Sequence, residues 1–238
     1  MKQQKETELI LALDCEDLQF ARKLLKQVQG ELQWVKIGLQ MFTAHGMPWV
    51  EEVHSMGFKL FLDLKLHDIP NTVAKAIQSL AAAPIDMLTL HASGGSEMCA
   101  YAVESRDASN PNLTLLAVTV LTSMNHSQLS ALNVNRSIEG QVLDLARISL
   151  ASKVDGLVAS PLELSILRTE LGSDPILVCP GIRPKGADLN EQKRVMTPEQ
   201  ARQLGADFIV VGRPILNSSD PHATVISIRR SLSMTKDG

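Results

Sequence analysis

An apolar run turns into a charged one in the segment 59–68, which reads Lys59-Leu-Phe-Leu-Asp63-Leu-Lys65-Leu-His-Asp68. A short apolar run of this kind is typical of a strand buried on both faces of a parallel sheet. Polar residues directly after such a strand lie at its C-terminal end, where the sites of α/β proteins form. The segment therefore predicts a buried strand over Lys59–Leu64 with a functional site at its end.

Seven further apolar runs share these features, because each is short, rich in Leu, Ile and Val, and followed by a longer amphipathic segment. This alternation is expected of a parallel sheet covered by helices. The other predicted strands are Leu9–Leu13, Trp34–Ile37, Met87–Leu90, Thr114–Val120, Gly156–Ala159, Ile176–Cys179 and Phe208–Val211. Eight strands in 238 residues predict an α/β fold, a single (βα)8 TIM barrel in which residues 1–238 form one catalytic domain.

Helices are predicted where the pattern becomes amphipathic between these strands. The predicted helices are Asp17–Val28, Pro70–Ala82, Glu97–Glu104, Ile138–Ser152, Leu162–Leu171, Pro198–Leu204 and Ala223–Leu232. The longest irregular stretch is Gly181–Met196, after the seventh strand. Because long loops in compact domains are usually functional, we expect this one to be a lid.

The amino-acid composition limits which partners and which cellular location we expect for this protein. Hydrophobic residues make up 45% and aromatic residues only 3%, so the core must be aliphatic. A net charge of −3 offers no general attraction to nucleic acid or to an anionic membrane, and we expect neither as a partner. The chain has no apolar stretch long enough to span a bilayer. Three scattered cysteines, without metal-ligand spacing, favour a reduced cytoplasmic location and predict no metal site.

Polar residues follow the predicted strands at the end where barrel enzymes carry their active sites. Asp63 and Lys65 are two apart on a strand, so their side chains leave the same face into the barrel mouth, and Asp68 follows in the turn. A buried lysine flanked by carboxylates keeps its proton and can donate it. We therefore predict a catalytic cluster of Asp63, Lys65 and Asp68, extended by Lys36. A structural ion pair, and for Lys36 a solvated strand end, are the alternatives.

The ends of the seventh and eighth strands predict an anion site. Gly181 and Gly212 let backbone amides approach a ligand, and Arg183 and Arg213 supply charge and paired donors. Phosphate binding after strands seven and eight recurs in this fold. A Gly-Arg turn that caps a helix is the alternative. His67 and His91 also lie near strand ends, but structural roles are the favoured interpretation of both.

Several segments, spread over nearly the whole chain, strongly resemble the signatures of the orotidine 5′-phosphate decarboxylase family. The longest is Phe61-Leu-Asp63-Leu-Lys65-Leu-His-Asp68-Ile-Pro70-Asn-Thr72. The others are Leu11-Ala-Leu-Asp14, Val35-Lys36-Ile-Gly38, Leu121-Thr122-Ser-Met124, Pro180-Gly-Ile-Arg183-Pro184 and Ile209-Val-Val-Gly212-Arg213-Pro214-Ile215. Asp-x-Lys-x-x-Asp alone is shared with related barrel enzymes of sugar-phosphate metabolism, so the combination is what narrows the resemblance. One departure is Glu191-Gln192, where relatives often carry Asp-Gln.

The resemblance implies an enzyme of de novo pyrimidine biosynthesis that converts orotidine 5′-phosphate (OMP) to UMP and CO2 without a cofactor. It implies that Lys65 stabilises a carbanion at C6 and protonates it, while Asp63 and Asp68 hold Lys36 and Lys65. It also implies a homodimer in which Asp68 and Thr72 reach the neighbouring subunit's site. The residues that it assigns to substrate binding are Asp14, Lys36, Thr72, Thr122, Pro180, Arg183, Gln192, Gly212 and Arg213.

Two other functions remain open at this stage. A metal-dependent sugar-phosphate decarboxylase or aldolase of the same suprafamily would need an acidic Mg²⁺ site, for which Glu16 and Asp17 are the candidates. A non-catalytic phosphate-binding barrel is disfavoured because the charged cluster is intact.

Overall fold

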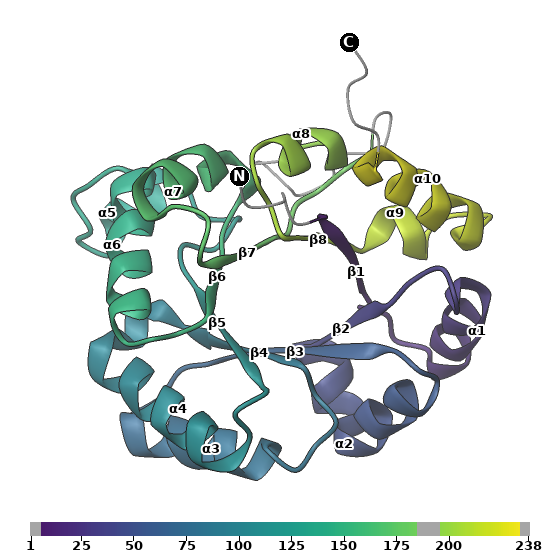
Figure 1. Cartoon of the computed structure of the whole chain (residues 1–238), viewed down its shortest axis with the longest axis horizontal. Helices are drawn as coiled ribbons and strands as arrows, with labels where there is room; N and C mark the ends of the chain where they lie inside the picture. Colours follow the sequence, from purple (N-terminus) through teal and green to yellow (C-terminus); the bar gives the residue numbers. More distant parts are fainter. Residues whose placement is uncertain (1–5, 185–195, 234–238) are drawn as a thin grey trace.

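The computed structural model describes residues 6–184 and 196–233. These residues form eight parallel strands that close into a barrel in sequence order, each neighbour hydrogen-bonded to the next. The strands are β1 Glu8–Ala12, β2 Trp34–Gly38, β3 Lys59–Leu66, β4 Met87–His91, β5 Thr114–Val118, β6 Gly156–Val158, β7 Ile176–Cys179 and β8 Phe208–Val211. Figure 1 looks into the ring of strands and shows the helices around its outside. The predicted (βα)8 barrel is confirmed.

The helices lie between the strands, as the alternating pattern predicted. The α-helices are α1 Leu18–Val28, α2 Leu39–Ser55, α3 Pro70–Leu80, α4 Gly95–Ser109, α5 His126–Ala131, α6 Ile138–Ala151, α7 Leu164–Leu171, α8 Pro198–Gln203, α9 Arg213–Leu216 and α10 Pro221–Ser233. Short 3-10 helices precede two of them, η1 at Ala92–Gly94 and η2 at Pro161–Glu163. No helix in 6–184 or 196–233 is long and apolar enough to cross a membrane.

The sequence prediction missed α2, α5 and α9. In α2 the reason is visible, because Gly46 takes a left-handed φ of 60° and Pro48 follows it inside the helix. Glycine and proline both interrupt a helical pattern, and here they mark a kink between two helical halves. The short helix α9 follows Gly212 directly, so the Gly-Arg turn considered from sequence does begin a helix.

Side chains alternate between the inside of the barrel and the layer beneath the helices. In β1, Leu9 and Leu11 belong to the large cluster between sheet and helices, whereas Ile10 and Ala12 belong to a smaller cluster inside the barrel. The other buried members of the inner cluster are Trp34, Phe61, Met87, Leu116, Val178 and Val210. Inward side chains that lie beyond this apolar layer, toward the C-terminal ends of the strands, therefore face the mouth of the barrel.

Strand β3 departs from regular pairing near its end. Leu62 pairs with Leu88 and Leu66 pairs with Leu90, so three residues of β3 lie opposite one residue of β4. Within this bulge Lys65 has a φ of 52°, a left-handed conformation that is unfavourable for a residue with a Cβ atom. The regular strand backbone expected between Asp63 and Lys65 is therefore not found here. Both side chains nevertheless line the cavity, as predicted.

Candidate active site

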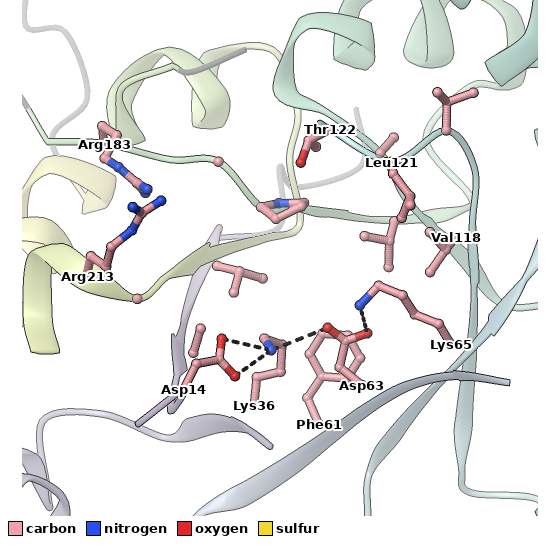
Figure 2. A pocket seen from close by; sticks show the side chains of 18 of the residues that line it. Asp14, Lys36, Phe61, Asp63, Lys65, Val118, Leu121, Thr122, Arg183 and Arg213 are labelled. Atoms are coloured by element: carbon pink, nitrogen blue, oxygen red, sulfur yellow. Dashed lines mark hydrogen bonds and ion pairs between the residues drawn. The ribbon is translucent and has the colours of Figure 1, made fainter. Parts of the chain in front are cut away.

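A cavity of about 410 Å³ opens at the C-terminal ends of the strands, a volume suited to a small ligand. Most of the site residues predicted from sequence line it. They are Asp14, Lys36, Asp63, Lys65, Thr122, Pro180, Arg183, Gly212 and Arg213. Figure 2 shows acidic and lysine side chains on one side of this cavity and two arginines on the other.

A chain of alternating charges runs along one wall of the cavity. Nζ of Lys36 lies 3.4 Å from the Asp14 carboxylate and 3.3 Å from Oδ2 of Asp63. Oδ1 of Asp63 accepts from Nζ of Lys65 at 2.8 Å. The side chains of Lys36 and Asp63 are only 10% and 12% exposed, whereas that of Lys65 is 31% exposed and reaches into the cavity. The cluster thus combines a buried carboxylate with a lysine that a ligand can contact.

Asp63 is the centre of this electrostatic arrangement. Burial by itself raises the pKa of its carboxyl, but Lys36 and Lys65 nearby, and hydrogen bonds from Lys65 and Thr89, outweigh burial and leave the pKa lowered. The site therefore favours the carboxylate form even though it is withdrawn from water.

Thr89 is a member of the cluster that sequence reasoning missed. It is fully buried on β4, and its hydroxyl accepts from the N–H of Lys65 at 2.8 Å and donates to Oδ1 of Asp63 at 3.0 Å. Its signal in the sequence was weak: it is a hydroxyl residue in the strand Met-Leu-Thr-Leu-His, at an inward position next to the strand that carries Asp63 and Lys65.

Gly38, at the end of β2, provides space for the cluster. A Cβ atom at this position would lie 2.7 Å from Oδ1 of Asp14 and 2.9 Å from Nζ of Lys36. Its φ of −93° is open to any residue. The absence of a side chain, and not backbone freedom, is therefore what lets Asp14 and Lys36 meet.

Two arginines form the opposite wall. Figure 2 shows the guanidinium groups of Arg183 and Arg213 pointing toward one another. Burial, and secondarily the charge of Arg213, lowers the pKa of Arg183. Gly181 before Arg183 has a left-handed φ of 78°, which glycine adopts without strain. Two facing cations in a cavity wall suit a ligand with a doubly charged anionic group.

Two predicted site residues in the described part of the chain, Asp68 and Thr72, do not line the cavity. Asp68 is exposed and its carboxylate accepts from the N–H of Ile69, and Thr72 is exposed on α3. Their predicted role across a dimer interface stays a prediction. Gln192, like most of the predicted lid Gly181–Met196, lies outside the described residues.

The two histidines beside the cluster stack on each other, with ring centroids 5.4 Å apart. Nδ1 of His91 lies 2.7 Å from the hydroxyl of Ser93, at the start of η1. Burial, then the charges of His67 and Lys65, lowers the pKa of His91. The structural roles favoured for both histidines from sequence stay a prediction.

The candidates for a metal site are not arranged as ligands. Asp17 accepts from the N–H of Gln19 and caps α1, and Glu16 is exposed beside it. Across the described part of the chain, no group of three His, Cys, Asp or Glu residues is placed to hold a metal ion.

Fold and site together define a (βα)8-barrel protein with two arginines in the cavity wall after strands β7 and β8 and a buried ionic cluster opposite. Anion sites at these two strands are a recurrent feature of phosphate-binding barrels. Within this class, the chain belongs to the family described as Orotidine 5'-phosphate decarboxylase / HUMPS family, whose family model matches residues 7–228. The resemblance seen in the sequence motifs is confirmed.

Individual relatives agree with this membership. The protein named orotidine 5'-phosphate decarboxylase from Opitutus terrae is 49% identical over 225 residues, which cover 94% of this chain and 98% of the relative. The protein of the same name from Idiomarina loihiensis is 43% identical and covers 94% and 97% of the two chains. The crystal structure of orotidine 5'-phosphate decarboxylase from Lactobacillus acidophilus superposes with a TM-score of 0.86 at 36% identity, covering 96% of this chain and all of the other.

Proposed function

We propose that this protein is an orotidine 5′-phosphate decarboxylase that acts as a single catalytic domain and converts OMP to UMP and CO2 in pyrimidine biosynthesis. The observation that carries the proposal is the pairing of Lys36, Asp63 and Lys65 in the same cavity as Arg183 and Arg213. The names of the relatives support the same activity.

The charges of the cavity suggest one orientation for OMP. The phosphate binds between Arg183 and Arg213, because guanidinium groups form paired hydrogen bonds to phosphate oxygens. The pyrimidine then lies toward Lys65, with Thr122 beside the ring. The ribose hydroxyls lie near the Asp14–Lys36 pair, which offers an acceptor and a donor. Pro180, Gly212 and the undescribed Gln192 complete the proposed contacts.

In this orientation the substrate carboxylate lies near Asp63, which is already ionised and buried. Two like charges about 4 Å apart repel by about 4 kcal/mol at an effective dielectric near 20. Loss of neutral CO2 moves this negative charge from the carboxylate to C6, away from Asp63 and toward the ammonium group of Lys65. Repulsion in the bound substrate therefore favours the bond cleavage, provided that the phosphate contacts hold the substrate in place.

Cleavage of the C6–carboxylate bond leaves the electron pair on C6 and releases neutral CO2. The ammonium group of Lys65 stabilises this carbanion and transfers a proton from Nζ to C6, giving UMP. Water then returns a proton to Lys65. Asp63 keeps the ammonium oriented, since Nζ donates to its Oδ1 at 2.8 Å. Fixed charges of this kind act without reorganising at the moment of reaction.

We also propose a homodimer in which Asp68 and Thr72 complete the site of the neighbouring subunit, since both are exposed and neither lines the cavity of its own chain. Mixing two inactive variants, Lys65→Ala and Asp68→Asn, tests this arrangement. Random hybrids of a two-fold dimer with shared sites recover about one quarter of the wild-type sites. If each site is built from one chain, the mixture stays inactive.

The activity itself is tested by the loss of OMP absorbance, measured with and without EDTA and with UMP identified as the product. We expect turnover that EDTA does not change. Turnover that needs a divalent cation, or turnover of a sugar phosphate in place of OMP, would favour the metal-dependent relatives. Binding of UMP without any turnover would favour a non-catalytic barrel.

A further inference from the structure

Thr89, on β4, is hydrogen-bonded to two residues of the ionic cluster on the neighbouring strand β3. Its hydroxyl accepts from the backbone N–H of Lys65 and donates to Oδ1 of Asp63, at 2.8 Å and 3.0 Å. The same oxygen of Asp63 accepts from Nζ of Lys65 at 2.8 Å. One buried hydroxyl thus links the main chain of Lys65 to the carboxylate that holds its side chain.

The backbone at this point needs such a link. The ladder between β3 and β4 is interrupted between Leu62 and Leu66, and Lys65 adopts a left-handed φ of 52° within the interruption. A residue with a Cβ atom keeps this conformation only when its surroundings fix it. The hydrogen bond from the Lys65 N–H to a side chain replaces a regular ladder bond and fixes the bulge.

The position of Thr89 separates it from the substrate. It is fully buried and is not one of the described residues that line the cavity, whereas Asp63 and Lys65 both line it. Its two hydrogen bonds both go to members of the ionic cluster across the interrupted ladder. A threonine that served only to fill the core would not need both of these partners.

We propose that Thr89 is a positioning residue, whose hydroxyl fixes the Lys65 backbone and the Asp63 carboxylate relative to each other and so aims Nζ of Lys65 into the cavity. This inference rests on the proposed function for its kinetic consequence. A displaced Lys65 still leaves the phosphate and ribose contacts intact. Removal of the hydroxyl therefore lowers kcat and leaves substrate binding nearly unchanged.

The test is Thr89→Val, which removes the hydroxyl and keeps the branched shape. We expect kcat for OMP to fall about 10- to 100-fold, or about 1.4 to 2.7 kcal/mol at about 1.36 kcal/mol per decade. We expect KM and the dissociation constant of UMP to change by less than about 3-fold. Thr89→Ser keeps the hydroxyl, and we expect it to retain most of the wild-type kcat.

Thr119→Val is the matched control. Thr119 is also buried, follows β5, and donates its hydroxyl to the carbonyl of Val158, away from the ionic cluster. We expect this variant to lose stability and to keep its kcat. An equal fall of kcat in Thr119→Val and Thr89→Val, or in Thr89→Ser and Thr89→Val, would overturn the proposal. If Thr89→Val does not fold, Thr89→Ser and Thr89→Ala, which differ by one oxygen, provide the same comparison.

Hydrogen exchange at the Lys65 amide provides a readout that is independent of activity. We expect Thr89→Val to speed exchange of this amide at least about 10-fold, because its acceptor is lost, and Thr119→Val to leave it unchanged. An unchanged Lys65 amide in Thr89→Val would refute the positioning role. Wild-type protein that does not decarboxylate OMP would refute the proposed function instead, while the exchange experiment would still decide the role of Thr89 in fixing Lys65.

Discussion

Replacement of Asp63 by asparagine removes the one charge that Lys36 and Lys65 share. Their ammonium nitrogens lie 3.3 Å and 2.8 Å from its carboxylate oxygens. At an effective dielectric of about 20, each attraction is worth about 5 to 6 kcal/mol before desolvation is subtracted. Desolvation offsets much of this, and breaking a buried pair at one partner typically costs about 3 to 5 kcal/mol. We expect Asp63→Asn to lower the free energy of unfolding by about 3 kcal/mol.

The unfolding free energy that Asp63→Asn loses depends on pH in a defined way. Because the folded-state pKa of Asp63 is lowered, its carboxylate contributes stability above its unfolded-state pKa of about 3.9. That contribution is lost as the pH falls through the folded-state pKa. The difference in unfolding free energy between wild type and Asp63→Asn is therefore full at neutral pH and shrinks below about pH 4. Urea unfolding at several pH values measures it.

Activity is the second readout for Asp63→Asn. Misplacement of a reacting group by about 1 Å can cost about 100-fold, and we expect kcat for OMP to fall by at least this factor. Asp207→Asn is the matched control. Asp207 pairs with Arg168 at 2.7 Å and is similarly buried, but it precedes β8 at the opposite end of the barrel. We expect Asp207→Asn to lose stability and keep its kcat. If Asp63→Asn keeps both its stability and its kcat, the account of the cluster is wrong.

Other changes test further parts of the site. Gly38→Ala places a Cβ atom 2.7 Å from Oδ1 of Asp14 and 2.9 Å from Nζ of Lys36. Because both contacted atoms are the ends of flexible side chains, we expect the variant to fold with Asp14 and Lys36 displaced. The KM for OMP should then rise by about 10-fold. We expect Arg213→Ala to lower kcat/KM for OMP by about 100-fold or more. The slow reaction of orotidine, which has no phosphate, should stay unchanged. Equal losses on both substrates would contradict the proposed phosphate site. Burial raises the pKa of the Cys179 thiol, so we expect disulfide reagents to modify it only upon unfolding in urea, and rapid modification of folded protein would refute this.

Much of the fold was readable because each strand is a short apolar run with a polar end. The same pattern placed Asp63 and Lys65 in the mouth of the barrel, and the structure brings them together at 2.8 Å. The bulge that contains Lys65 could not be read, because it depends on how β3 and β4 pair. Thr89 was missed for the same reason: its partners lie more than 20 residues away in sequence and meet it only through that pairing.

Other misses had local physical causes. Gly46 and Pro48 interrupt the pattern of α2, whose two halves meet at a kink there, and the packing of α2 against β2 and β3 could not be read from the sequence. Gly38 belongs to a recognised motif, but its function as space for Asp14 and Lys36 depends on two side chains meeting over it. Sequence patterns thus predicted many of the residues that line the cavity, whereas the contacts that fix their geometry required the structure.

We propose that Lys65, held by Asp63, carries out the decarboxylation of OMP. The most direct test compares wild type with Lys65→Ala for turnover of OMP and for binding of UMP. We predict metal-independent turnover in the wild type, a fall in kcat of at least about 10⁴-fold in the variant, and UMP binding weakened by no more than about 10-fold. A Lys65→Ala variant that still decarboxylates OMP at a rate near that of the wild type would contradict it.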